Sequence, residues 1–286
     1  MRFTATEAGA SVCLDRNLNN SIDNTTEDSA DTKLINLQYS LNGGSWSKYA
    51  LGTAINLDEN GYVEFKALGS NETISKSNRN RYQFAVEGKV NASGNIQSLL
   101  VEDNFKDKKD VPAYCYSNMF TGCTGLQTAP NLPATTLANN CYYVMFYGCT
   151  GLQTAPQLPA TTLANFCYFN MFYGCTGLQT APDLPATTLA NNCYSNMFTG
   201  CTGLQTAPDL PATTLANRCY YGMFSECTGL QTAPDLPATT LANNCYSNMF
   251  YGCTKFDSVN MKKSMEGVYS TSTHGDIKKT VNYVLD

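Results

Sequence analysis

Twelve of the thirteen cysteines fall into six pairs, and their chemistry has to be decided first. Within each pair the cysteines are eight residues apart, and each pair follows the last by 26 residues, with Cys13 left over. Equivalent cysteines on repeats stacked ~4.8 Å apart would lie within the range of disulfide-bonded residues. They recur beside Met and Phe, however, where cysteine acts as a small buried hydrophobic side chain. We therefore favour ladders of reduced thiols over disulfides between repeats.

The other candidate groups for catalysis or metal binding are few. His274 is the only histidine and lies in a polar segment outside the repeats, whereas Ser–His–Asp and Cys–His mechanisms need a histidine beside the nucleophile. Zinc is disfavoured because the short Cys-x2-Cys knuckle does not occur. Three aspartates recur at intervals of 26 because the repeats do, not as a catalytic pair. The sequence predicts no enzyme, no cofactor and no catalytic residue.

One segment near the N-terminus is a weak candidate for calcium binding. Oxygen-bearing side chains stand at the first, third, fifth and ninth positions of an EF-hand-like loop: Asp15, Asn17, Asn19 and Asp23. The pattern then fails, since Asn20 replaces the glycine at position six and Thr26 replaces the bidentate glutamate at position twelve. A solvated loop between two strands is the favoured interpretation.

The elements that position these residues follow from the 26-residue period. A fixed period between 20 and 50 residues is typical of a solenoid, in which each short unit buries its apolar side against the next. Within a copy, positions equivalent to 140, 143, 144 and 147 change while the cysteines, Met145 and Phe146 recur. This spacing is that of one face of an α-helix, so we predict a short helix over 140–147. The segment 152–163 is predicted to be extended, with one very short strand.

Composition divides the chain into three parts. All eleven prolines lie between Pro112 and Pro237, whereas the charged residues lie mostly outside the repeats. The first part has alternating apolar residues and the turn signal Asn42-Gly43-Gly44, which favours a small β-sandwich with an immunoglobulin-like topology as one option. We predict an α+β protein with a β-sandwich-like head (1–110), a solenoid of six strand-plus-helix coils (111–254) and a C-terminal cap (255–286).

Charge and hydropathy limit the environment of the protein. The net charge of −5 and the lack of a basic cluster disfavour a nucleic-acid partner. No apolar run approaches the ~20 residues of a membrane span, and the chain begins without a signal-peptide core. We expect either a protein that stays inside a cell or a mature fragment without its export signal.

The changing positions of the repeats are the predicted binding surface. Mixtures of Tyr with Ser and Asn are common in protein interfaces, although neutral drift would also vary exposed positions. The uniform Gln153 and Thr154 side is a second option, suited to a repetitive ligand such as a glycan. The predicted partner-binding residues are Tyr143, Val144, Tyr147, Phe166, Phe169, Asn170, Tyr173, Arg218, Tyr221 and Tyr251.

The repeated phrase Met-Phe-Tyr-Gly-Cys-Thr-Gly-Leu-Gln-Thr-Ala-Pro-Asp-Leu-Pro-Ala-Thr-Thr-Leu-Ala resembles the BspA-type leucine-rich repeats of bacterial surface proteins. The resemblance covers 115–254, about half of the chain, and the head resembles a β domain found before such repeats in gut Bacteroidales proteins. It implies a leucine-rich-repeat solenoid, a location at the cell surface or secretion, and non-catalytic adhesion to a host or bacterial protein or glycan. The alternative is a structural or receptor-binding fibre component of a phage of gut bacteria.

Overall fold

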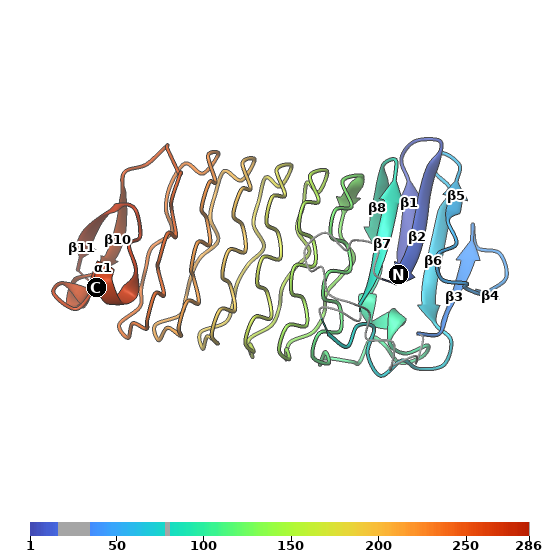
Figure 1. Cartoon of the computed structure of the whole chain (residues 1–286), viewed down its shortest axis with the longest axis horizontal. Helices are drawn as coiled ribbons and strands as arrows, with labels where there is room; N and C mark the ends of the chain where they lie inside the picture. Colours follow the sequence, from blue (N-terminus) through green and yellow to red (C-terminus); the bar gives the residue numbers. More distant parts are fainter. Residues whose placement is uncertain (17–34, 78–80, 286) are drawn as a thin grey trace, which may run out of the picture.

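The computed structural model describes residues 1–16, 35–77 and 81–285. The molecule is elongated, with strands near the N-terminus at one end and the C-terminal strand pair at the other (Figure 1). Between these ends, the six copies of the repeat form successive parallel turns of chain that lie one against the next (Figure 1). The buried apolar residues of all three parts form one continuous core.

The N-terminal part contains two open sheets. Strands β1–β8 are Arg2–Ala5, Ala10–Arg16, Leu37–Leu41, Ser47–Lys48, Ile55–Leu57, Tyr62–Ala67, Tyr82–Glu87 and Val90–Ser93. One sheet has the order β4-β3-β6-β1-β8-β9 and the other β5-β2-β7. Pairing among β1–β8 is antiparallel, and Phe3, Phe65 and Phe84 meet with ring centroids 4.9 to 6.2 Å apart. Alternation of apolar residues along these strands supplies this aromatic core.

The first repeat is joined directly to this part. Strand β9 (Leu126–Thr128) pairs in parallel with β8, and the Phe120 ring stacks on Phe84 at 5.5 Å with 10° between the planes. The Cys123 thiol also donates to the Phe84 carbonyl at 3.1 Å. The end of the stack is therefore covered by apolar surface instead of facing water, as a terminal repeat requires.

The predicted fold class is wrong. The chain is not α+β, and strand-plus-helix coils of a leucine-rich-repeat solenoid are not seen. Most of the regular secondary structure of the described residues is strand, the sheets are open, and their only α-helix is α1 (Thr271–His274), which lies outside the repeats. The segment 140–147, predicted to be helical, is a run of hydrogen-bonded turns.

These turns satisfy the backbone by an alternation that no α-helix has. The N–H of Tyr142 donates to the carbonyl of Cys167 in the next copy at 3.0 Å, whereas the N–H of Tyr143 donates back to Asn140 at 3.2 Å. The same alternation continues to Gly148, so every second N–H links neighbouring copies. Buried backbone groups need such partners, and here half of the donors use the adjacent copy. One copy alone could not satisfy its own backbone.

Left-handed residues at intervals of four explain why the sequence pattern imitated a helix. Asn140, Val144 and Gly148 have φ of 57°, 57° and 69°, and equivalent residues in other copies also have positive φ. Asn and Gly take this conformation most readily, which accounts for their recurrence at these positions. A turn repeated every four residues produces changing positions at i, i+3, i+4 and i+7, close to the 3.6-residue period of a helix. The periodicity was real, but its cause was a different backbone.

Two aromatic ladders run through the stack. The phenylalanine rings lie 5.2 to 5.7 Å apart with 2° to 6° between neighbouring planes, and the tyrosine rings lie 5.8 to 6.2 Å apart. All twelve side chains are buried. The ladders consist of Phe120, Phe146, Phe172, Phe198, Phe224 and Phe250, and of Tyr116, Tyr142, Tyr168, Tyr194, Tyr220 and Tyr246. Parallel stacking of identical rings fixes the register of each copy on the next.

The cysteines line the same interior. The twelve repeat cysteines are buried free thiols, and Cys13 is a partly buried free thiol. The Cys149 thiol donates to the carbonyl of Phe120 in the preceding copy at 3.0 Å, and the next four copies repeat this contact. These bonds give the thiols a role as small buried donors. Their reduced state in solution remains a prediction.

The other side of each copy is extended but barely a strand. Single parallel bridges join Thr128, Thr154, Thr180 and Thr206 in one row, and a second row runs from Thr136 to Thr240. Apart from β9 in the first copy, these segments are too short to be strands in the described chain. The prolines between the rows lack the N–H that a longer ladder would need.

The C-terminal part ends both ladders. Strands β10 (Ser258–Lys262) and β11 (Thr280–Val284) pair in parallel beyond the last copy. Phe256 meets the last ladder phenylalanine edge-on at 5.4 Å, and Tyr269 lies tilted against the last ladder tyrosine at 6.4 Å. A tilted ring cannot continue a parallel stack, which closes this end.

Glu226 allows a direct test of the left-handed turns. It has a φ of 59°, and the equivalent position is glycine in the other five copies. Because a non-glycine residue in this conformation costs ~1–2 kcal/mol, Glu226→Gly should raise the free energy of unfolding by about 1 kcal/mol. Denaturant unfolding measures this change. Glu226→Gln keeps the Cβ and removes the charge, so an equal gain from that control would assign the effect to charge and contradict the backbone explanation.

The buried acids predict alkaline lability. Burial raises the pKa of Cys123, Cys167 and Cys175 from an ordinary value of 9.0 to about 12 and raises the pKa of Tyr168 well above its ordinary 10.0. The unfolded chain therefore loses these protons first, and stability that is constant below pH ~9 should fall as the pH rises toward ~12. Measuring the denaturant midpoint of unfolding at a series of pH values tests this. In Tyr168→Phe the midpoint should fall less steeply with pH, because the variant keeps the ring and removes one acid. A midpoint unchanged across this range would contradict the buried environment.

Candidate binding face

The predicted partner-binding residues lie on one face of the stack but are not equally exposed. We call the positions equivalent to 140, 143, 144 and 147 the varied face. Arg218 and Tyr251 are exposed on it, with Tyr251 at 53%. Val144 is buried at 5% exposure, so the expectation that it faces water is wrong. The remaining seven are half-buried: Tyr143, Tyr147, Phe166, Phe169, Asn170, Tyr173 and Tyr221.

Aromatic side chains of the second and third copies pack on one another. Tyr143 stacks on Phe169 with centroids 5.1 Å apart and planes 3° apart, and Tyr147 stacks on Tyr173 at 4.8 Å and 11°. Phe166 lies tilted against Phe169 at 5.7 Å. We call these five residues the aromatic patch. Each ring uses one face inside the patch, which leaves a continuous, half-buried aromatic surface.

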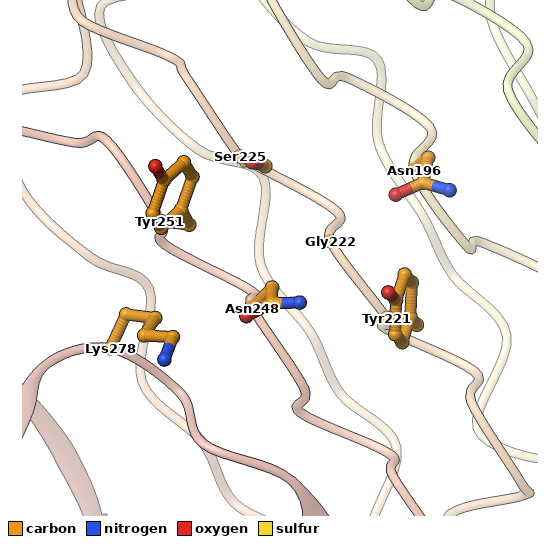
Figure 2. Close-up of a pocket in the computed structure, with 7 residues that line it drawn as sticks. All are labelled: Asn196, Tyr221, Gly222, Ser225, Asn248, Tyr251 and Lys278. Atoms are coloured by element: carbon orange, nitrogen blue, oxygen red, sulfur yellow. The ribbon is translucent and has the colours of Figure 1, made fainter.

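Farther along the same face, the surface opens into a hollow of about 310 Å³. Its lining comes from the fourth, fifth and sixth copies and from the C-terminal part (Figure 2). In this view Tyr221 and Tyr251 stand on opposite sides of Asn248 (Figure 2). The lining residues are Asn196, Tyr221, Gly222, Ser225, Asn248, Tyr251 and Lys278.

The hollow exists because two positions carry unusually small residues. The position of Gly222 is occupied by Asn in four of the six copies, and the position of Ser225 is occupied by Tyr in three. A Cβ at Gly222 would collide with Oδ1 of Asn196, so the glycine leaves room for that amide. Where adjacent copies both carry tyrosine at the position of Ser225, as Tyr147 and Tyr173 do, the rings stack and fill this space. Thr199 and Ser225 take this position in the fourth and fifth copies, so Tyr251 has no ring beside it and the space is open.

The uncharged polar side chains of the hollow have no hydrogen-bond partner among the described residues. The side chains of Asn196, Asn248 and Ser225, and the hydroxyls of both tyrosines, form no hydrogen bond within the described part of the chain. The Arg218 guanidinium lies 6.0 Å from the centroid of the Tyr221 ring. Among the described residues, neither lining tyrosine has an aromatic stacking partner, in contrast to the patch. Both rings and amides are therefore free to contact a ligand.

The one charged residue of the lining is paired. Lys278 Nζ lies 2.7 Å from Asp276 Oδ2, outside the lining. Hydrogen bonds from the Lys278 side chain and then from its backbone hold the pKa of Asp276 below its ordinary value. Both side chains are substantially exposed, so the pair contributes little to stability. It does neutralise the one charged residue of the lining.

The groups considered for catalysis are used elsewhere or buried. Nδ1 of His274 accepts a hydrogen bond from the Ser270 N–H of its own loop at 3.1 Å, and the ring stacks on Tyr269 at 6.1 Å. Burial raises the pKa of the repeat thiols, which opposes formation of a nucleophilic thiolate. Within the described ranges, no group of three His, Cys, Asp or Glu side chains is placed to hold a metal ion. That the protein is not an enzyme remains a prediction.

The weak calcium candidate can be followed only in part. Asp15 lies on β2, where its Oδ1 accepts a hydrogen bond from the Arg16 N–H at 2.7 Å. The other three members of the set, Asn17, Asn19 and Asp23, lie outside the described residues.

Sequence reasoning located the face but missed most of the hollow. Of its seven lining residues, only Tyr221 and Tyr251 belong to the predicted set. The missed signal was that Gly222 and Ser225 are smaller than most of the residues at the equivalent positions of the other copies, since a small residue among larger ones leaves a space. The contribution of Lys278 had no such signal, because the C-terminal part does not follow the period.

The comparisons with other proteins add no identity. No family model, no curated protein and no solved structure matches this chain. In the described part of the chain, no helix has both the length and the apolar character needed to cross a membrane.

Proposed function

We propose that this protein is a non-catalytic binding or adhesion module that recognises a protein or glycan partner through the varied face. The hollow between Tyr221 and Tyr251 is the observation that carries this proposal. In the second and third copies the equivalent space is filled by the stacked rings of Tyr147 and Tyr173. A concave site with unsatisfied polar groups and free aromatic rings is the usual form of a binding site.

The aromatic patch extends the proposed contact surface along the stack. It offers Tyr and Phe rings whose orientation is fixed by stacking, so little conformational entropy is lost when a partner covers them. Together with the hollow it forms a stripe over several copies. A stripe of this kind suits a partner that lies along the face, while the hollow holds one protruding group of that partner.

The proposed setting is the surface of a bacterium or its surroundings. The resemblance of the repeated phrase to BspA-type surface repeats supports a cell-surface or secreted location and adhesion as the biological role. The buried, free thiols do not oppose this, because their stability rests on packing and not on disulfides.

A binding screen against glycans and host proteins tests the proposal. The triple variant Tyr143→Ser, Phe169→Ser and Tyr221→Ser places on these copies the serine found in the other three, so it should fold. It should lose most of the binding seen with the natural chain, at least about tenfold in affinity. Trp46→Ser removes an exposed aromatic of the head and should bind normally. Unchanged binding by the triple variant would reject the varied face as the contact surface.

A further inference from the structure

We infer that the hollow is a site for a single neutral sugar ring, such as the terminal pyranose of a glycan. This inference rests on the proposed binding function and names the class of ligand that the hollow would take. Four properties of the lining support it: its size, its aromatic walls, its polar groups and its charge.

The size of the hollow sets the first limit. About 310 Å³ lies at the lower end of the ~300–1,000 Å³ range of small-molecule sites. One ring with its substituents fits such a volume, whereas several linked rings do not. A longer glycan would therefore enter by one terminal unit and continue over the surface.

The two tyrosines provide walls for a ring with an apolar face. Tyr221 comes from the fifth copy and Tyr251 from the sixth, on opposite sides of Asn248 (Figure 2). A pyranose ring presents C–H groups on its faces and hydroxyls around its edge. The C–H groups suit contact with an aromatic face, and burying these groups removes apolar surface from water.

The remaining lining groups match the edge of such a ring. Each Asn carboxamide offers a carbonyl acceptor and an NH2 donor, and the hydroxyls of Ser225 and the tyrosines can donate or accept. None of these side-chain groups is used within the described part of the chain. Adjacent sugar hydroxyls need donors and acceptors in mixed order, and Asn196 and Asn248 supply both. A site that pairs with a hydroxyl discriminates strongly against a ligand that lacks it.

Charge distinguishes neutral sugars from acidic ones. Lys278 is the one charged lining residue, and Asp276 neutralises it at 2.7 Å. A carboxylated sugar would have to compete with Asp276 for this ammonium group. A cationic ligand would find no carboxylate in the lining. The hollow therefore favours a polar ligand without net charge.

The natural repeat supplies a variant that closes the hollow without foreign chemistry. Ser225→Tyr places tyrosine next to Tyr251, as Tyr147 stands next to Tyr173, where the rings stack at 4.8 Å. The new ring should stack in the same way and occupy the space of the ligand. Gly222→Asn is a second closing variant, because asparagine stands in this row in four copies and tolerates the left-handed conformation.

The experiment is saturation-transfer NMR of the full chain with free neutral hexoses and N-acetylhexosamines, and with a uronic acid as the charged comparison. We expect transfer to at least one neutral sugar and at least about a tenfold loss of affinity in Ser225→Tyr and Gly222→Asn. Ser225→Tyr should unfold at or above the midpoint of the natural chain, and Gly222→Asn should stay folded with the Asn196 amide turned away from the new Cβ. Ser47→Tyr, the same substitution on the exposed strand β4, should bind sugar normally.

Three results would overturn the inference: no transfer to any neutral sugar, equal transfer in folded closing variants, or preference for the uronic acid. The binding screen separates this failure from failure of the proposed function. If a protein partner binds the natural chain but not the triple variant, and no sugar binds, the proposed binding function is supported and the sugar site is rejected. If neither a protein nor a sugar binds the natural chain, both the proposed function and the sugar site are rejected.

Discussion

The structure depends on the register between neighbouring copies. Every second backbone N–H of the turn segment donates to the next copy, as Tyr142 does to Cys167, and the ladder rings lie parallel only when identical positions face each other. A shift of one residue would place donors opposite donors, and the ladder rings would no longer stack on their equivalents. The buried polar groups would then lack partners, at a cost that the aromatic contacts could not offset. The strict 26-residue period is the sequence record of this constraint.

The same constraint explains the division between constant and changing residues. Phe146 recurs because its ring stacks on the equivalent rings of the adjacent copies, and Cys149 recurs because its thiol donates to the carbonyl of Phe120 in the preceding copy. Asn or Gly recurs at most of the corners because the backbone there is left-handed, and the tolerated exceptions are Tyr114, Val144, Phe166, Arg218 and Glu226. Of the positions that change, those equivalent to 140 and 144 are themselves left-handed corners, and those equivalent to 143 and 147 lie between the corners. A binding face could therefore diversify there while the interior stayed uniform, which is how the hollow at Ser225 could arise without loss of the stack.

Sequence reasoning predicted local features well where chemistry alone decides them. The tight turn at Asn42-Gly43-Gly44 is confirmed, since β3 and β4 pair around it and Asn42 and Gly43 have positive φ. A second turn, at Asn60, does not join paired neighbours, because β5 and β6 belong to different sheets. Pairing over long distances is not encoded in the turn itself, and the sequence pattern could not supply it.

The helix prediction failed for a physical reason that also bears on the site. Four-residue turns and a 3.6-residue helix bring the same positions to one face, so periodicity alone located the varied face but assigned the wrong backbone. Hydrogen bonds to another copy decide between them, and these are invisible in one copy. The hollow was missed for a related reason: it is a property of three adjacent copies and the C-terminal part together, not of any single residue.

Deleting one copy tests the register most directly. Removal of the 26 residues 171–196 joins Asn170 to Met197 and leaves every ladder in phase, so we expect a shorter protein with one cooperative unfolding transition. Removal of the 25 residues 171–195 leaves one extra Asn inside the turn segment and should abolish cooperative unfolding. Denaturant unfolding followed by tyrosine fluorescence distinguishes the two. If both shortened chains unfold alike, the stack does not depend on its register.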